Sequence, residues 1–206
     1  MHAPHQDPPI SAVRSAYGSR AREYAELFGA ADRIAPEDRA LVERWARGVD
    51  GGVLDVGCGP GQWTRLLGEL GVPAIGIDPV PEFIELARAA FPECRFRAGA
   101  AEATGFGDAE FGGVLSWYSL IHTEPDRVGE ALAEFRRILA PGGQLALGFF
   151  EGPRLEVFDH AVVTAYFWPL ARMIRELDAA GFDTSHTETR TDPGSRAHAA
   201  VTAVRR

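Results

Sequence analysis

The stretch VLDVGCGPGQWTRLL, residues 53–67, predicts a strand, a tight turn and a helix in direct succession. The run that begins at Val53 is short and apolar, without polar alternation, as in a strand buried on both faces of a parallel sheet. After the turn, apolar residues recur with helical spacing at Trp63, Leu66, Leu67 and Leu70. The stretch therefore predicts the opening unit of an α/β fold.

The predicted turn carries three glycines at every second position, Gly57, Gly59 and Gly61. Glycine permits φ > 0 and lets a ligand approach the backbone, while the first amides of the following helix point outward without partners. The pattern predicts a cradle for a nucleoside-bearing cofactor. Dinucleotide-binding folds use G-x-G-x-x-G, and Gln62 occupies the position of the third glycine. A nicotinamide-dependent oxidoreductase is therefore disfavoured.

Together with Asp55, this stretch resembles the first motif of class I S-adenosylmethionine-dependent methyltransferases. The sequence IGIDP strengthens the resemblance, because Asp78 ends a second apolar run 23 residues after Asp55. That spacing is close to the one at which a carboxylate binds a ribose diol. An alternative role for Asp78 is the N-cap of the next helix. The resemblance covers the chain from about residue 11 and implies S-adenosyl-L-methionine as the cofactor.

The resemblance also implies which residues contact the cofactor: Tyr17, Asp55, Gly57, Cys58, Gly59, Gly61, Gln62, Asp78, Pro79, Ala100, Ala101, Glu102, Ser116 and Trp117. Ala100 departs from the family pattern, in which an acid at this position takes the adenine amino group. Losing such a hydrogen bond costs about 1.5–3 kcal/mol if the group is left buried. The backbone amide of Ala101 can still meet the adenine ring, and Glu102 or a water is left to replace the acid.

The segment SWYSLIH, residues 116–122, follows the fourth predicted strand at the edge where open α/β sheets bind ligands. His122 titrates near neutrality and could take a proton from a hydroxyl or amine acceptor, with capping or packing as its alternative role. Trp117 and Tyr118 could flank the sulfonium through cation–π contacts or form ordinary pocket wall. We predict His122 and Tyr118 as catalytic residues. Thr123 is expected to cap the helix that follows.

Two segments are expected to shape the acceptor site. Residues 11–48 predict an N-terminal helical lid with Tyr17 and Tyr24 on one helix face, although simple packing on the sheet is the alternative. Residues 151–168 are rich in aromatic side chains and follow a strand whose end faces the cofactor. This favours a wall of the substrate pocket over a dimer patch. The predicted substrate contacts are Tyr24, Glu151, Phe158 and Tyr166.

Apolar periodicity and turn residues predict the remaining elements. Helices are expected at 36–48, 81–90 and around 170–177, a turn at 141–143, and strands at 74–77, 95–98, 113–117, 144–150, 182–189 and 197–204. The helix after Thr123 is expected to bury Val128, Leu132, Phe135 and Leu139. We predict an α/β, Rossmann-like, doubly wound sheet of seven mostly parallel strands, with a C-terminal antiparallel hairpin and helices on both faces. A flexible tail at 1–10 precedes a single methyltransferase domain at 11–206.

Composition excludes several classes of function. The 206-residue chain has a net charge of −8 and no basic run, which argues against a nucleic-acid partner. It contains no Lys, so a Schiff-base lysine, a pyridoxal-phosphate anchor and a Walker A motif are impossible. It has no apolar run near the ~18 residues that a membrane helix needs, and no signal sequence at its start. We expect a cytoplasmic protein without a membrane partner, either a monomer or a homodimer.

The spacing of the Cys and His residues does not indicate a metal site or a disulfide. Cys58 and Cys94 do not form a C-x-x-C pair, and the six His residues show no ligand spacing, so we expect reduced thiols and no metal.

The predicted reaction is methyl transfer from S-adenosylmethionine to an O or N atom of a small-molecule metabolite by in-line displacement. The alternative is a methyltransferase-like protein that binds the cofactor or a metabolite without methylating it.

Overall fold

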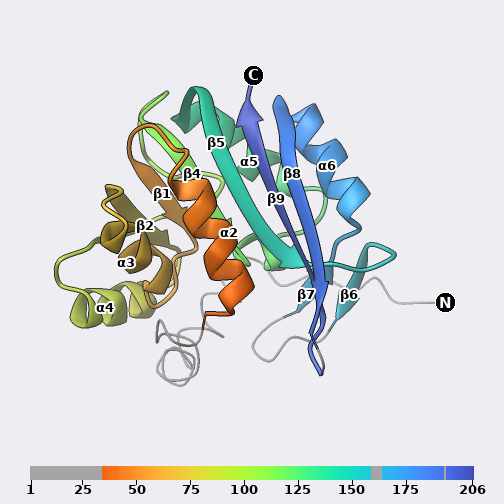
Figure 1. The fold of residues 1–206 in the computed structure, drawn as a ribbon, viewed down its shortest axis with the longest axis horizontal. Coiled ribbons are helices and arrows are strands. Elements are labelled where there is room, and N and C mark those ends of the chain that lie inside the picture. The colour runs from red at the N-terminus through yellow and green to blue at the C-terminus, as the bar shows by residue number, and fades with distance from the viewer. Residues whose placement is uncertain (1–33, 159–163, 193) are drawn as a thin grey trace.

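The computed structural model describes residues 34–158, 164–192 and 194–206, and a seven-stranded sheet forms its centre (Figure 1). In spatial order the strands are β3 (Arg95–Ala98), β2 (Ala74–Asp78), β1 (Val53–Val56), β4 (Phe111–Trp117), β5 (Leu139–Phe150), β9 (Ala197–Arg205) and β8 (Phe182–Thr191). β6 (Glu156–Phe158) and β7 (Ala165–Phe167) form a separate antiparallel pair. The helices are α2 (Pro36–Ala46), α3 (Gln62–Glu69), α4 (Pro81–Ala90), the 3₁₀ turn η2 (Leu120–His122), α5 (Val128–Ile138) and α6 (Leu170–Ala179).

The pairing of the strands confirms the predicted fold class. β3, β2, β1, β4 and β5 pair in parallel, and β9 lies antiparallel between β5 and β8. The chain proceeds outward from β1 to β3 on one side, then returns to place β4 on the other side of β1. Open α/β sheets bind ligands at such a reversal of strand order, outside the carboxyl ends of the strands. This topology places the crevice between the ends of β1 and β4.

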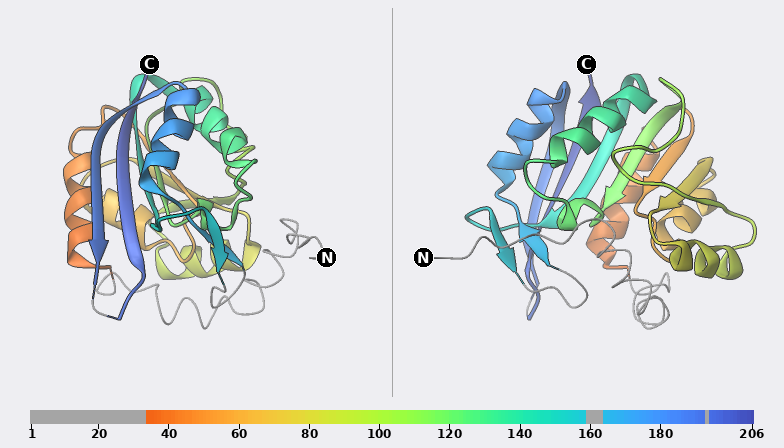
Figure 2. Two further views of the ribbon diagram at one scale, coloured as in Figure 1. Left: turned by 90° about the vertical axis from the view of Figure 1, so that its right-hand side faces the viewer. Right: turned by 180° about the vertical axis from the view of Figure 1, so that it is seen from behind.

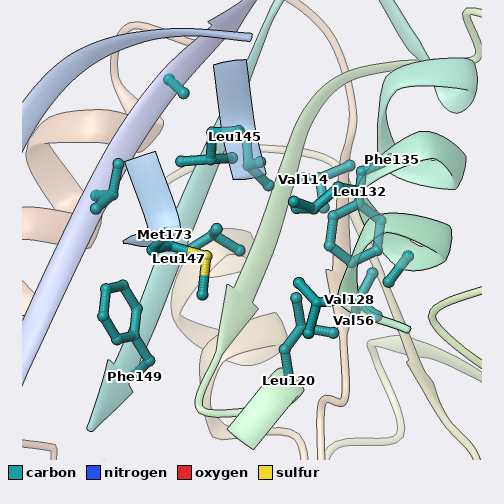
Figure 3. Packing of buried hydrophobic residues seen from close by; sticks show 14 of the residues in the cluster. Val56, Val114, Leu120, Val128, Leu132, Phe135, Leu145, Leu147, Phe149 and Met173 are labelled. Atoms are coloured by element: carbon teal, nitrogen blue, oxygen red, sulfur yellow. The ribbon is translucent and has the colours of Figure 1, made fainter. Parts of the chain in front are cut away.

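Helices cover both faces of the sheet, as Figure 2 shows with α2 on one side and α5 and α6 on the other. On the α5 face, Val128, Leu132 and Phe135 pack against buried residues of β4 and β5, including Leu145 and Leu147 (Figure 3). On the other face, buried residues of α2 and α3 form a second core: Leu41, Val42, Trp45, Trp63, Leu66 and Leu67. The two cores fix the sheet from both sides, and its carboxyl edge carries the loops that build the site.

Two local predictions were wrong. Thr123 does not cap α5, because its backbone is extended, with φ −77° and ψ 130°, and the helix begins at Val128. A hydrogen bond from the backbone amide of Arg127 to the carbonyl of Glu124 closes a separate turn first. The predicted turn at 141–143 is instead part of β5, which begins at Leu139 and bulges before its pairing with β4 resumes at Gln144. The bulge absorbs the extra residues, so no separate connection is needed.

The predicted tail at 1–10 and residues 11–33 of the predicted lid lie outside the described residues, and so do Tyr17 and Tyr24. The end of the predicted lid forms α2, whose apolar face is buried. The division of the chain into tail, lid and domain stays a prediction.

Candidate functional site

The three glycines of the turn after β1 all have positive φ: +71° at Gly57, +52° at Gly59 and +93° at Gly61. A Cβ added to Gly57 would lie 2.2 Å from the Cβ of Ser119, and one added to Gly61 would lie 2.7 Å from the ring of Phe96. Gly57 and Gly61 are therefore required by packing. A Cβ on Gly59 meets no atom within 4 Å. Gly59 thus faces open space in which a ligand can approach the backbone.

Asp78 ties this turn to the second strand. Its carboxylate accepts a hydrogen bond from the amide of Gly59, at 3.0 Å, and another from the amide of Val80, at 2.8 Å. The second bond resembles the predicted alternative role as a helix cap, but Val80, not Asp78, occupies the N-cap position of α4. Asp78 therefore positions the turn and stands where the resemblance expects a ribose-binding acid.

Asp55 and Cys58 lie behind the turn rather than on its open side. Asp55 is 1% exposed, and its Oδ2 accepts a hydrogen bond of 2.6 Å from the hydroxyl of Thr64. Burial, assisted by the nearby charge of Asp78, raises the pKa of Asp55 to about 7. Burial also raises the pKa of the Cys58 thiol well above its usual value, which keeps that thiol protonated and unreactive.

A cavity opens at the carboxyl edge of the sheet beside this turn. Its lining residues are Val56, Gly57, Pro79, Ala100, Ala101, Glu102, Ser119, His122, Thr123, Glu124, Arg127, Glu130 and Ala131. The structure thus brings together five of the predicted cofactor residues: Gly57, Pro79, Ala100, Ala101 and Glu102. The segment from Glu124 to Ala131, which sequence reasoning did not assign to the site, supplies one wall.

The loop that carries Ala100 to Glu102 is anchored to α5. Glu134 accepts hydrogen bonds from the amide and hydroxyl of Thr104, at 3.0 and 2.6 Å. The Arg137 guanidinium binds Glu134 and lowers the pKa of that carboxyl to about 2. Glu134 is therefore ionised at neutral pH, and the loop is held against the helix.

The two predicted catalytic residues lie in different surroundings. His122 lines the cavity, and its Nδ1 donates to the carbonyl of Thr164 at 2.7 Å. Tyr118 is not among the residues that line the cavity. Its Oη lies 2.5 Å from Nδ1 of His198 on β9. Sequence reasoning missed His198 because only the register of β9 against β5 places it beside Tyr118. Burial raises the pKa of Tyr118, and burial together with Arg190 lowers the pKa of His198.

Ser116 and Trp117 are buried, and their predicted contact with a cofactor stays a prediction. The hydroxyls of Ser116 and Ser119 share a hydrogen bond of 2.5 Å, which links the end of β4 to the residue packed on Gly57. The indole of Trp117 donates to Asp38 at 3.4 Å and packs on Trp63. Both residues shape the backbone of the site.

Gln62, at the start of α3, supplies a test of fit for a cofactor. Within the part of the chain that the structure describes, its Oε1 is buried and accepts no hydrogen bond. A buried acceptor without a partner is costly, and a bound amine or hydroxyl beside the turn could satisfy it. This acceptor and the open space at Gly59 together fit a polar, nucleoside-bearing group.

The predicted substrate residues Glu151, Phe158 and Tyr166 lie beyond the end of β5. Glu151 forms an isolated bridge with Trp168, and Phe158 and Tyr166 belong to the β6–β7 pair. Tyr166 is buried in the core on the α5 face, whereas Phe158 is half-buried. Their contact with a substrate stays a prediction.

Among the described residues, no three His, Cys, Asp or Glu side chains are grouped as metal ligands. No helix in the same residues is long and apolar enough to cross a membrane.

Comparison with known proteins gives one consistent answer. Residues 53–143 match the family described as "Methyltransferase domain". An uncharacterised methyltransferase of Mycobacterium bovis is 37% identical over 95 residues, covering 46% of this chain and 38% of the relative. An uncharacterised methyltransferase of Synechocystis is 31% identical over 139 residues, covering 63% of this chain and 66% of the relative. The chain thus spans less than two thirds of the length of these curated relatives.

A solved structure matches the whole of this chain. It is the 1,6-didemethyltoxoflavin-N1-methyltransferase of Burkholderia thailandensis, with bound 1,6-didemethyltoxoflavin and S-adenosylhomocysteine. The TM-score is 0.81 and the identity 25%, over 100% of this chain and 93% of that one. With the glycine turn, Asp78 and the cavity at the reversal of strand order, these matches identify the chain as a member of the class I S-adenosylmethionine-dependent methyltransferases.

Proposed function

We propose that the protein transfers a methyl group from S-adenosylmethionine to an O or N atom of a small-molecule metabolite. The observation that carries this proposal is the open space at Gly59, bounded by Asp78 and the adjoining cavity at the carboxyl edge of the sheet. The toxoflavin methyltransferase supports it, because that relative was solved with bound 1,6-didemethyltoxoflavin and S-adenosylhomocysteine.

Different residues would bind different parts of the cofactor. The turn from Gly57 to Gly61 offers backbone to the cofactor, Gln62 offers a buried acceptor, and Asp78 offers a carboxylate beside them. Ala100 and Ala101 line the adjoining cavity, where the resemblance expects the adenine. When bound, S-adenosylmethionine supplies an electrophilic methyl group. The protein's own task is to align the acceptor and exclude water.

Alignment of the acceptor with the methyl group is expected to contribute more to the rate than proton removal by a general base. Holding two reactants in a reactive geometry can lower a barrier by ~7–11 kcal/mol, whereas a general base contributes about 10²–10⁴-fold in rate. The proposed function therefore does not depend on whether His122 acts as the base. Tyr118, at the end of β4, and His122, in the cavity wall, both remain proposed catalytic residues.

A second candidate is a protein that binds the cofactor or a metabolite without methylating it. Ala100 favours this candidate, because the lining of the cavity has an apolar methyl where an acid is expected. If Glu102 or a water replaces the acid, the loss of affinity is smaller than the ~tenfold to hundredfold that a missing charged hydrogen bond implies.

The test is transfer of labelled methyl from S-adenosylmethionine to a set of hydroxylated and amine metabolites, with product detection by mass. We expect one chemical class of acceptor to gain the label at a rate that depends on enzyme concentration. Binding of S-adenosylhomocysteine without label in any acceptor would support the second candidate and contradict the first.

A further inference from the structure

Ser119 lies where the loop after β4 meets the glycine turn, and it lines the cavity together with Gly57. A Cβ added to Gly57 would lie 2.2 Å from the Cβ of Ser119 and 3.2 Å from its Oγ. The preceding residue, Tyr118, has a φ of +56°, which is rare for a bulky side chain, and its amide donates to the carbonyl of Gly148 at 2.8 Å. Such strain persists where the surroundings impose it, often at binding sites. The fold thus holds Ser119 against the turn.

The hydroxyl of Ser119 does not serve its own helix. Ser119 is the N-cap residue of η2, a position at which a serine side chain commonly accepts a hydrogen bond from a backbone amide of the first turn. No such side-chain bond forms here. Its Oγ lies instead 2.5 Å from Oγ of Ser116, at the end of β4. The side chain is therefore directed toward the carboxyl edge of the sheet.

Burial decides which of the two serines donates in this bond. Ser116 is 1% exposed, and among the described residues the hydroxyl of Ser119 is its only hydrogen-bond partner. A buried hydroxyl hydrogen without an acceptor is costly. If Ser119 donated, the hydrogen of Ser116 would be left in that state. Ser116 therefore donates, and the hydroxyl hydrogen of the half-buried Ser119 is left for a group in the cavity.

The backbone amides of the glycine turn are already used inside the protein. Each N–H in residues 57–61 has an acceptor, and residue 60 is a proline without an N–H. The acceptors are the carbonyl of Ile77 for the first two amides, the carboxylate of Asp78 for the third and the carbonyl of Cys58 for the last, at 2.8–3.0 Å. The turn therefore cannot bind an anionic group through these amides, and Ser119 supplies a hydrogen-bond donor beside it.

The carboxylates of the cavity gather on its other side, around Arg127. The hydrogen bond from Arg127 to Glu130, at 2.9 Å, raises the pKa of Arg127, and the nearby charges of Glu102 and Glu124 raise it further. These acids come from the loop after β3 and from the segment that leads into α5. Because like charges repel, an anionic group of a ligand is favoured near Ser119 rather than near these acids.

The strand order indicates which end of the cofactor reaches Ser119. The sheet places β3, β2, β1 and β4 side by side in that order (Figure 1). The resemblance expects the adenine at Ala100, after β3, and the ribose at Asp78, after β2. The remaining amino-acid end then lies over the turn after β1 and beside Ser119, after β4. Its ammonium group is a donor and suits backbone carbonyls, whereas its carboxylate accepts hydrogen bonds only and needs a donor.

We propose that the hydroxyl of Ser119 binds the carboxylate at the amino-acid end of S-adenosylmethionine and so selects for a cofactor that carries this carboxylate. This inference rests on the proposed function, because it concerns the cofactor of that reaction. A hydrogen bond to an ionised acceptor is stronger than one between neutral groups. Ser119 therefore discriminates against the decarboxylated form of the cofactor, which retains the adenosine and the ammonium group.

The test compares two probes by calorimetric titration into the full-length protein. S-Adenosylhomocysteine carries the carboxylate, and decarboxylated S-adenosylhomocysteine lacks only that group. The wild type should bind the first at least about tenfold more tightly than the second. Ser119→Ala should weaken binding of S-adenosylhomocysteine about tenfold to hundredfold, as expected for loss of a hydrogen bond to a charged group, and change binding of the decarboxylated probe less than about twofold.

Two further variants serve as controls. Ser185→Ala removes a comparable hydroxyl pair, in which Ser185 and Thr202 lie 2.8 Å apart, on the edge strand β8. It should leave both affinities within about twofold of wild type. Ser119→Cys retains a side chain at this position but offers only a weak donor, so it should show the same selective loss even if Ser119→Ala does not fold. Melting temperatures measured on the same samples report the stability of each variant.

The outcomes separate this inference from the proposed function. An equal loss of affinity for both probes in the Ser119 variants would show that packing on Gly57, and not a bond to the carboxylate, causes the effect, and would overturn the inference. Unchanged affinity for both probes would also overturn it. Failure of the wild type to bind S-adenosylhomocysteine would contradict the proposed function itself.

Discussion

Gly59 and Gly71 form a matched pair for testing whether the glycine turn is a cofactor cradle. Both have positive φ, +52° and +77°, and a Cβ added to either meets no atom within 4 Å. Alanine at either position therefore suffers the same kind of backbone strain, about 1–2 kcal/mol, without a clash inside the protein. Only Gly59 lies in the turn that Asp78 holds.

The two substitutions should separate stability from binding. For a chain of this size, 1 kcal/mol shifts the melting temperature by about 2–4 °C, so Gly59→Ala and Gly71→Ala should both lower it by a few degrees. In Gly59→Ala the new methyl also occupies the space into which the cofactor is proposed to approach. We expect S-adenosylhomocysteine affinity to fall at least about tenfold, or ~1.4 kcal/mol, in Gly59→Ala only.

The assay is calorimetric titration of S-adenosylhomocysteine into wild type and both variants, with melting temperatures measured on the same samples. A loss of affinity of the same size in Gly71→Ala would show that backbone strain, and not a filled cradle, causes the effect. Unchanged affinity in Gly59→Ala would refute the assignment of the turn.

Three further predictions concern the cavity and the buried acid. Ala100→Asp restores the expected acid and should tighten S-adenosylhomocysteine binding about tenfold; weaker binding by calorimetry would show that another group already serves the adenine. His122→Ala should weaken that binding several-fold if His122 acts as cavity wall, whereas unchanged affinity with turnover reduced about 10²-fold or more would support the base role. Asp55 has a pKa raised from 3.8 to about 7, so the native state retains a proton that the unfolded state has lost, and stability should fall as pH rises from about 4 to 7. The decline in the free energy of unfolding is at most about 1.4 kcal/mol per pH unit, and Asp55→Asn should remove it. Thermal unfolding of wild type and variant across this pH range measures the effect, and parallel pH profiles of the two proteins would contradict the prediction.

The fold was predictable because its signals are local. The strand, glycine turn and helix at 53–67 and the acid at Asp78 specify a βαβ unit, and short apolar runs mark the other parallel strands. The start of α5 was not predictable from Thr123, because a separate turn closed by Arg127 competes with helix formation there. The bulge in β5 arises from pairing with β4, which no local pattern reports.

The site was predictable where sequence neighbours act together and not where distant strands meet. Gly57, Pro79 and Ala101 follow directly from the motifs and line one cavity. The pairing of Tyr118 with His198 depends on the register of Phe150 against His198 and on the positive φ of Tyr118. Neither feature leaves a signal in a single sequence, and the contact that they produce joins residues 80 positions apart.

Calorimetric titration of the wild-type protein with S-adenosylmethionine and, separately, with S-adenosylhomocysteine tests the central claim most directly. The structure predicts one site per chain with micromolar or tighter affinity for both compounds, despite Ala100. No detectable binding of either compound would contradict the assignment of the turn, Asp78 and the cavity as a cofactor site.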